Sequence, residues 1–131
     1  MNATDLEHLR RCIALAAEAA ERGDDPFGSV LVSGDGEVLA ERSNKVVTTN
    51  DRAAHPELAL ALWASRHLDA PTRAAATMYT SGEHCPMCAA AHVWTGIGRL
   101  VYVLSSPMIA DLVEPGISID LRAIDIVAAS N

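Results

Sequence analysis

The chain has 131 residues and the composition of one small globular domain. Half of the residues are hydrophobic and only 4% are aromatic, which excludes an intrinsically disordered chain and predicts a core of Ala, Val, Leu and Ile. The formal net charge is −7, and the ten Lys and Arg residues form no basic run. A large nucleic-acid substrate is therefore disfavoured, because binding to a phosphate backbone depends on clustered cations.

The segments that direct a chain to a membrane or out of the cell are not seen in this sequence. No stretch approaches the roughly 20 apolar residues that span a bilayer, and the polar, acidic amino terminus is unlike a signal peptide. Three cysteines cannot close a full set of disulfides, which favours free thiols or metal ligands in a reducing compartment. We therefore expect a cytoplasmic protein in which residues 1–131 form a single domain, since no repeat or linker interrupts the chain.

The hydrophobic pattern of the first part of the chain predicts a helix followed by a β-hairpin. Apolar residues recur at helical spacing over residues 4–22. Two short strands, residues 28–32 and 37–41, flank an Asp-Gly pair, which is a strong hairpin signal. A polar loop over residues 44–52 follows.

In the rest of the chain, predicted helices alternate with predicted strands. The helix over residues 56–68 is apolar on almost every side and is expected to be buried. The later elements are a strand at 75–80, a helix at 86–95, a strand at 99–104, a short helix at 107–112 and a last strand at 123–128. This order predicts an α/β fold, a three-layer α/β/α sandwich with a central mixed five-stranded sheet.

Two short segments place a potential metal ligand directly before a proline that starts a predicted helix. One is His55-Pro-Glu57 and the other is Cys85-Pro-Met-Cys88. Proline suits the first helical position and holds the preceding residue in extended backbone, so His55 and Cys85 should project from helix ends. Glu57, in the first turn, can then face the same point as His55. Cys88, three residues after Cys85, should lie on the same side of its helix.

These residue types suit a catalytic zinc site. His55, Cys85 and Cys88 would supply three ligands, and a catalytic zinc keeps its fourth position for water, whose pKa falls to about 7. The free N–H groups at a helix start favour the thiolate form of cysteine. Glu57 is placed to transfer protons. The sequence thus predicts one zinc ion per chain, with Glu57 as the catalytic residue.

Each segment also has a simpler interpretation. Cys-x-x-Cys alone is also typical of a redox pair or of half a structural zinc site, and His-Pro-Glu is often only a capped helix start. A structural site needs a fourth protein ligand. His84 is the histidine to watch, although its place directly before Cys85 is awkward for closing a tetrahedron. Cys12, inside the first helix, is expected to be a buried apolar residue.

In this order and spacing, the two segments resemble the His-x-Glu and Pro-Cys-x-x-Cys signature of the zinc-dependent cytidine and adenine deaminases. Residues 26–32, 43–45, 78–81 and 97–102 also look like segments of this superfamily, so the resemblance covers most of the chain. It implies a cytidine deaminase-like fold and the hydrolytic removal of an amino group.

Within the superfamily the chain most resembles bacterial guanine deaminases, through residues 26–28, residues 46–51 and Trp94. The resemblance implies that Asn44 hydrogen-bonds the edge of the base, that Phe27 and Trp94 line the substrate pocket, and that the protein is a homodimer. Simpler roles stand beside these: Phe27 can fill the core, Trp94 can pack its helix, and Asn44 can stabilise a turn.

The function we predict is hydrolysis of a nucleobase or similar amino-heterocycle, with guanine to xanthine as the first choice. The alternatives are another small substrate (cytosine, a nucleoside or an aminotriazine), a tRNA adenosine deaminase, and a non-catalytic binding protein of this fold, against which the intact Glu57 argues. Two departures bear on the substrate. His84 stands where the family has proline, and the segment up to Asn131 is shorter than the carboxyl-terminal segment that helps to close the site in guanine deaminases of this type.

Overall fold

A mixed four-stranded sheet lies at the centre of this computed structural model, which describes residues 1–112 and 117–130. The strand order is β2-β1-β3-β4. Strand β1 is antiparallel to both of its neighbours, and β3 is parallel to β4. The strands are β1 (Gly28–Val32), β2 (Val38–Ser43), β3 (Thr77–Gly82) and β4 (Arg99–Leu104).

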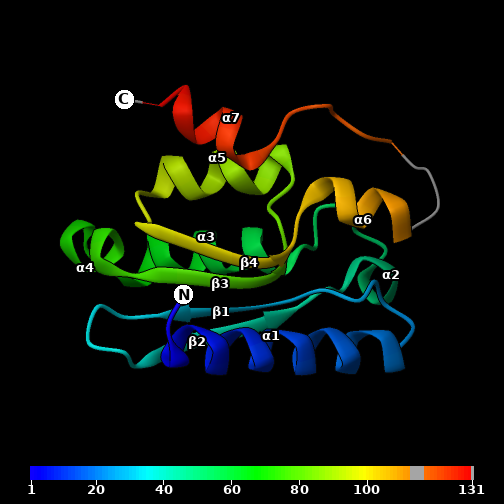
Figure 1. Cartoon of the computed structure of the whole chain (residues 1–131), viewed down its shortest axis with the longest axis horizontal. Coiled ribbons are helices and arrows are strands. Elements are labelled where there is room, and N and C mark those ends of the chain that lie inside the picture. Colours follow the sequence, from blue (N-terminus) through cyan, green and yellow to red (C-terminus); the bar gives the residue numbers. More distant parts are fainter. Residues whose placement is uncertain (113–116, 131) are drawn as a thin grey trace.

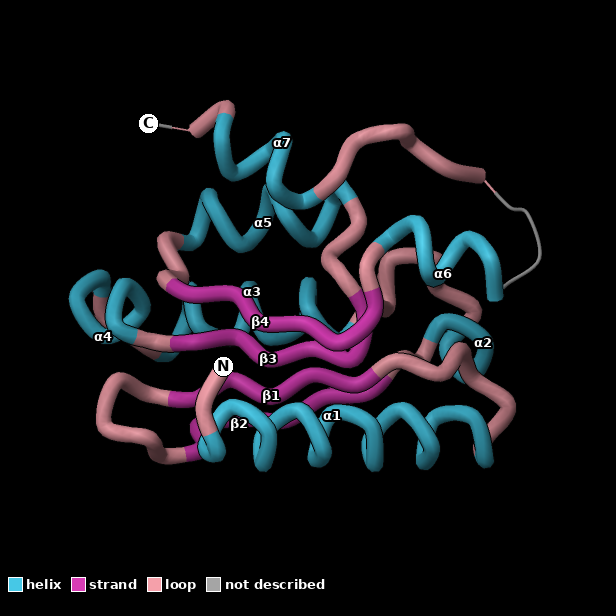
Figure 2. The backbone as a smooth tube through the Cα atoms, viewed as in Figure 1, coloured by secondary structure: helices cyan, strands magenta, loops and turns pink. Residues whose placement is uncertain are grey.

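Helices cover both faces of the sheet (Figure 1). Helix α1 (Ala3–Glu21) lies along one face, whereas α3 (Pro56–His67) and α5 (Pro86–Thr95) lie on the other. Helix α7 (Ala123–Ala128) packs on the outer side of α5, as the tube in Figure 2 also shows. Three short helices lie in the connections: α2 (Val46–Thr49), α4 (Ala70–Ala75) and α6 (Ser106–Leu112).

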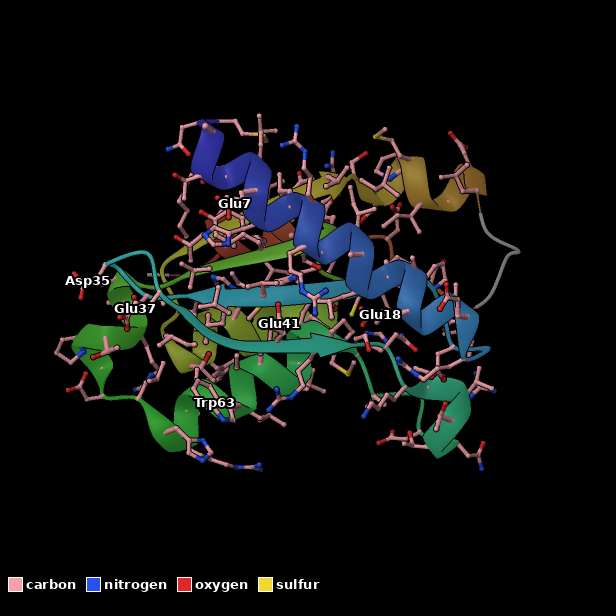
Figure 3. All side chains as sticks on the ribbon, turned by 90° about the horizontal axis from the view of Figure 1, so that it is seen from below. Glu7, Glu18, Asp35, Glu37, Glu41 and Trp63 are labelled. Atoms are coloured by element: carbon pink, nitrogen blue, oxygen red, sulfur yellow. The ribbon has the colours of Figure 1, made fainter. Side chains whose placement is uncertain are left out.

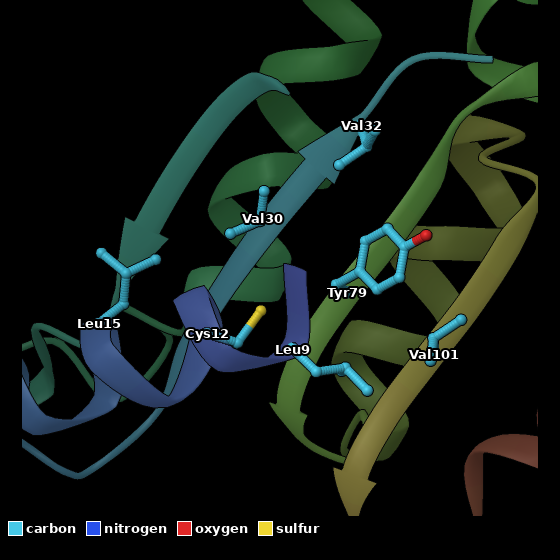
Figure 4. Close-up of a cluster of buried hydrophobic side chains, with 7 residues drawn as sticks. All are labelled: Leu9, Cys12, Leu15, Val30, Val32, Tyr79 and Val101. Carbon is cyan, nitrogen blue, oxygen red and sulfur yellow. The ribbon is translucent and has the colours of Figure 1, made fainter. Parts of the chain in front are cut away.

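The face of the sheet under α1 is closed by an apolar cluster (Figure 4). Its members come from one side of α1 and from alternate positions of three strands, as expected for side chains that point to one face of a sheet. They are Leu9, Cys12, Leu15, Val30, Val32, Tyr79 and Val101. The helix approaches β1 so closely that a Cβ atom at Gly28 would lie 2.4 Å from the Cβ of Leu15. Only glycine fits at that position without displacing α1.

A second apolar cluster lies on the opposite face of the sheet, under α3 and α5. It joins the buried side of α3 to the strands, and its members are Leu31, Leu60, Ala61, Ala64, Ala76, Met78 and Ile97. Helix α3 was predicted to be apolar on almost every side and buried. It buries one side only, as the 40% exposure of Leu62 shows.

The predicted order of helices and strands is confirmed up to α6, with small shifts at the element ends. Helix α2 falls inside the predicted polar loop, and α4 precedes β3. Cys12 is fully buried, as predicted. No helix among the described residues is both long and apolar enough to cross a bilayer.

The prediction of a fifth strand is wrong, because residues 123–128 form helix α7. Local hydrogen bonds start this helix: the carboxylate of Asp125 accepts from the backbone N–H of Arg122 (2.8 Å). A distant residue contributes as well, since the N–H of Ala123 donates to the buried Glu83 (3.0 Å). These contacts outweigh the strand preference of the β-branched residues in the segment. Within residues 1–112 and 117–130 the sheet therefore has four strands rather than five.

Candidate metal centre and active site

The starts of α3 and α5 bring the three predicted metal ligands together. His55 and Cys85 are the N-cap residues of these helices, and each has extended backbone before a proline, as predicted. Nδ1 of His55 lies 3.6 Å from Sγ of Cys85 and 3.5 Å from Sγ of Cys88. One donor atom from each of the three residues lies within 4.8 Å of the other two, close enough for a shared metal ion. We call this set the His55–Cys85–Cys88 cluster.

The spacing of the cluster fits zinc. In a tetrahedral site with Zn–S near 2.3 Å and Zn–N near 2.0 Å, the sulfur and nitrogen ligands are about 3.5 Å apart, which is the separation found here. One imidazole with two thiol groups is also a donor set that zinc favours. Among the described residues no fourth His, Cys, Asp or Glu joins the set. Three protein ligands are typical of a catalytic rather than a structural zinc.

A hydrogen bond between the two cysteines favours the thiolate form of one of them, Cys85. The hydrogen bond from the Cys88 thiol, together with the neighbouring His55, lowers the pKa of Cys85 to about 4 despite its burial. The same hydrogen bond and burial raise the pKa of Cys88. The bond to Cys85 also raises the pKa of His55. At neutral pH Cys85 is therefore a thiolate, the form in which cysteine binds a metal.

Glu57 lies in the first turn of α3 and is buried beside this cluster. Its carboxyl group is within hydrogen-bond reach of the Cys88 thiol. One carboxylate oxygen, Oε1, accepts from the hydroxyl of Thr80 (3.2 Å); the hydroxyl of Ser29 donates to Thr80 (2.8 Å) and lies 3.3 Å from the same oxygen. Burial raises the pKa of Glu57 above its ordinary value. A buried carboxyl with a raised pKa beside a metal site is suited to proton transfer near neutral pH.

His84 lies outside the cluster, and its side chain is hydrogen-bonded to His92 instead. Its Nε2 atom is 3.1 Å from Nδ1 of His92, and Nε2 of His92 is 3.1 Å from the carbonyl oxygen of Gly98. Because a carbonyl can only accept, we assign the protons to both Nε2 atoms. Nδ1 of His84 then has no partner among the described residues, and burial lowers the pKa of His84 to about 3. His84 is thus neutral, and by its position it does not belong to the set of three metal ligands.

Two of the three predicted substrate-binding residues, Phe27 and Asn44, lie next to the ends of strands β1 and β2, on the side of the sheet where α3 and α5 begin. Asn44 is buried, and its Oδ1 accepts from the N–H of Val46 (2.9 Å), so it does stabilise a turn. The Asn44 N–H donates to the carbonyl of Phe27 (2.9 Å), and the Phe27 ring packs against Gly82 at the end of β3. Trp94 differs: it is 87% exposed and stands near the end of α5, whereas Cys85 stands at its start. The structure does not bring Trp94 to the cluster.

Four residues at or near the site were not found from the sequence. Ser29 and Thr80 hold Glu57, and their only sequence signal is a hydroxyl at an inward-facing strand position. Glu83, two residues before Cys85, is buried and is bound by Arg122. Nothing in a single sequence links a glutamate to an arginine that lies so far along the chain.

A sequence model of the MafB19-like deaminases matches residues 3–130, nearly the whole chain. The chain belongs to the MafB19-like deaminase family. Its relatives place it in the cytidine/deoxycytidylate deaminase superfamily, which confirms the resemblance seen in the sequence. The His55–Cys85–Cys88 cluster is typical of the zinc site of these aminohydrolases.

Relatives of more than one activity match this MafB19-like deaminase. The guanine deaminase of Bacillus subtilis is 41% identical over 87 residues, which are 66% of this chain and 55% of the relative. The tRNA-specific adenosine deaminase of Agrobacterium fabrum is 38% identical over 102 residues, 78% of this chain and 66% of the relative. The chain thus spans less than two thirds of the length of these relatives. The X-ray structure of the Bacillus subtilis guanine deaminase superimposes with a TM-score of 0.74 at 35% identity, over 86% of this chain and 70% of that one.

Proposed function

We propose that this MafB19-like deaminase hydrolyses the amino group of a small heterocycle, with guanine to xanthine and ammonia as the first choice. The observation that carries the proposal is the convergence of His55, Cys85 and Cys88, from two separate helix starts, beside the buried carboxyl of Glu57. The reaction consumes one water and releases one ammonia for each amino group replaced by oxygen. It therefore needs a nucleophile and a group that moves protons.

The residues of the cluster divide these tasks. A zinc ion held by His55, Cys85 and Cys88 would lower the pKa of water at its open position and so supply a nucleophile near neutral pH. Glu57 takes one proton from the water and passes it to the ring nitrogen, and it then takes the proton of the newly added hydroxyl group and passes it to the amino group, which departs as ammonia. Its Oε1 is anchored by hydroxyl groups, which leaves Oε2 for this exchange.

Asn44 and Phe27 are the side chains we propose for binding the base. Oδ1 of Asn44 is engaged by the backbone, so its amide N–H groups are the part of the side chain left to donate to an acceptor on the base. Phe27 lies next to Asn44, because the backbone N–H of Asn44 donates to its carbonyl group. Its apolar ring is therefore available at the same end of the strands. A flat heterocycle needs this combination of one apolar wall and a few directed polar groups.

The distribution of charge supports a small substrate over a polynucleotide. Acidic side chains on α1 and the β1–β2 hairpin include Glu7, Glu18, Asp35, Glu37 and Glu41 (Figure 3), of which Glu18 and Glu41 are paired with Arg11. The net charge of −7 has the same sign as a phosphate backbone. A tRNA adenosine deaminase stays the second candidate, because a relative of that activity matches at an identity close to that of the guanine deaminase.

An ammonia-release screen on the purified protein tests these candidates. Zinc is measured first and should approach one ion per chain. The protein is then incubated with guanine, adenine, cytosine, their nucleosides, an aminotriazine and a transcribed tRNA. Ammonia from guanine supports the first choice, whereas inosine formed in the tRNA alone would establish the second candidate. Zinc binding without ammonia from any compound would overturn the enzymatic proposal.

We also propose a homodimer. Apolar side chains are exposed on α5 and α7, which pack against each other, namely Met87, Trp94, Ile124 and Val127. Exposed apolar groups on adjoining helices are typical of an interaction surface. A second copy of the chain would remove them from water.

A further inference from the structure

A pair of hydroxyl groups interrupts the apolar face of the sheet that packs against α3. Leu31 of β1 and Met78 of β3 are direct cross-strand partners on this face, and both are fully buried. Two residues along each strand, the next pair on the same face is Ser29 with Thr80, which is also fully buried. Two buried hydroxyls therefore stand where the pattern of the face calls for apolar side chains.

The hydroxyl pair contacts the carboxyl group of Glu57. Oγ of Ser29 donates to Oγ1 of Thr80 at 2.8 Å, and Thr80 and Ser29 lie 3.2 and 3.3 Å from Oε1 of Glu57. Both contacts go to the same oxygen. A buried carboxyl group without hydrogen-bond donors destabilises the folded protein, because the group has lost its contacts with water. The two hydroxyls offset this cost at one oxygen.

The two hydroxyls form a chain of hydrogen bonds that ends at Glu57. A hydroxyl group can donate one hydrogen bond while it accepts another, so Ser29 can donate to Thr80 while Thr80 donates to Oε1. Ser29 thereby fixes the direction in which the Thr80 hydroxyl points.

We propose that Ser29 and Thr80 are positioning residues, which fix Oε1 of Glu57 and thereby direct Oε2 toward the His55–Cys85–Cys88 cluster. The inference rests on the proposed function, because that function gives Glu57 the proton transfer. The last torsion of a glutamate side chain is intrinsically broad, so an unanchored carboxyl group would rotate. Two hydroxyls carried by central strands of the sheet supply a rigid support, which a group that must approach a reacting atom requires.

Four substitutions separate this role from ordinary packing. Thr80→Val removes the hydroxyl and keeps the shape of the side chain, Ser29→Ala removes the other hydroxyl, and Thr80→Ser restores the hydroxyl without the methyl group. Thr77→Val is the matched control, because this substitution makes the same chemical change at the far end of β3, away from Glu57. Zinc content is measured for each variant and should match that of the parent protein.

The kinetic outcome distinguishes positioning from binding. We expect Thr80→Val to lower kcat by about 10- to 100-fold, the scale expected for a misplaced catalytic group, with KM changed by less than about twofold. Ser29→Ala should have a smaller effect in the same direction. Thr80→Ser should recover most of the activity, and Thr77→Val should behave as the parent. Unchanged kcat in Thr80→Val, or a Thr80→Ser variant as slow as Thr80→Val, would overturn the inference.

A second measurement does not depend on turnover. The carboxyl band of Glu57 is assigned in the infrared spectrum of the zinc-loaded protein by subtracting the spectrum of Glu57→Gln. We expect this band to shift in Thr80→Val and in Ser29→Ala and to stay in place in Thr77→Val. No shift in either hydroxyl variant means that the hydroxyls do not hold the carboxyl group, and the inference fails. Absence of ammonia release from every compound would instead overturn the proposed function. The infrared band would still show whether the hydroxyls hold the carboxyl group of Glu57.

Discussion

The guanidinium group of Arg122 binds both carboxylate oxygens of Glu83, with Nη2 2.9 Å from Oε2 and Nε 3.2 Å from Oε1. The backbone N–H groups of Ser106 and Ala123 donate to the same carboxylate at 2.6 and 3.0 Å. Glu83 stands two residues before Cys85. One buried carboxylate therefore ties the starts of α6 and α7 to the loop that carries a proposed metal ligand.

Replacement of Glu83 should loosen the carboxyl-terminal helices. Burial raises the pKa of Glu83, but the hydrogen bonds from Arg122, Ser106 and Ala123 outweigh it and lower the pKa below its ordinary value. Glu83→Ala removes these bonds, and we expect the free energy of unfolding to fall by about 2–3 kcal/mol. Urea denaturation measures the loss, and hydrogen exchange should show faster exchange in α7. Glu37→Ala, at an exposed acid of the hairpin, is the control; an equal loss there would contradict the assignment.

Glu57→Gln should separate metal binding from turnover. The amide keeps the size of the side chain but cannot accept and return a proton, so we expect kcat to fall by at least about 100-fold. Zinc content should stay unchanged, because Glu57 is not part of the ligand set. Atomic emission and ammonia release measure the two quantities. Glu7→Gln, at an exposed acid of α1, should leave both as in the parent, and near-normal turnover in Glu57→Gln would show that the proton-transfer group lies elsewhere.

Removal of zinc should abolish the activity reversibly. We expect a chelator to lower zinc content and ammonia release in parallel, and added Zn²⁺ to restore both, because three ligands from two helix starts hold the proposed ion. Cys85→Ser should bind zinc poorly, since it removes the thiolate. Cys12→Ala is the matched control: this third cysteine lies on the buried side of α1, away from the cluster. Full activity in protein shown to be free of metal would refute the zinc proposal.

The contribution of Asp5 to stability should depend on pH. Hydrogen bonds from Arg99 and from the hydroxyl of Tyr79 hold the pKa of this buried carboxyl well below its ordinary value of 3.8. A group whose pKa is lowered by folding stabilises the folded state above its unfolded-state pKa, and this stability is lost as the pH falls through the folded-state value. Asp5→Asn should therefore unfold at lower denaturant concentration than the parent at pH 7, and the two midpoints should converge as the pH drops below about 4. Asp35→Asn, at an exposed position of the hairpin, should unfold at the same denaturant concentration as the parent at pH 7. A difference between the midpoints of Asp5→Asn and the parent that does not change with pH would contradict the assignment.

Trp94 gives a test of the proposed homodimer. Because its side chain is 87% exposed in the single chain, burial between two copies would contribute strongly to association, and we expect Trp94→Ser to shift the protein toward monomer. Sedimentation at a series of concentrations measures the shift. Val47→Ser changes an exposed apolar residue on α2 and should leave the association unchanged. A parent protein that sediments as a monomer at every concentration would refute the homodimer.

The parts of the fold and the site that could be predicted are those set by neighbouring residues. A proline after His55 and after Cys85 fixes an extended residue at a helix start, and this rule acts within one turn of chain. The alternating and helical patterns identified the strands and the main helices for the same reason. The types of ligand in the two segments suggested a shared zinc site, and the resemblance to a superfamily then supported their pairing.

The parts that could not be predicted depend on contacts between distant residues. The β-branched residues of the last segment indicated a strand, but the carboxylate of Glu83, some 40 residues away, helps to start helix α7. The hydroxyls of Ser29 and Thr80 meet at Glu57 only because β1 and β3 are neighbours in the sheet. Trp94 was placed in the pocket by resemblance, and no pattern within one helix distinguishes a pocket wall from an outer surface.

Gly28 links the two faces of the sheet through its neighbour. The absent side chain lets α1 rest directly on β1, and the next residue, Ser29, reaches the carboxyl of Glu57 on the other face. A larger residue at position 28 would displace the helix or the strand, and a displaced strand would carry the Ser29 hydroxyl with it. The protein would then lose turnover through a defect in helix packing, although every residue that contacts the substrate is intact. Inactive variants selected at random should therefore include changes on the α1 side of the molecule.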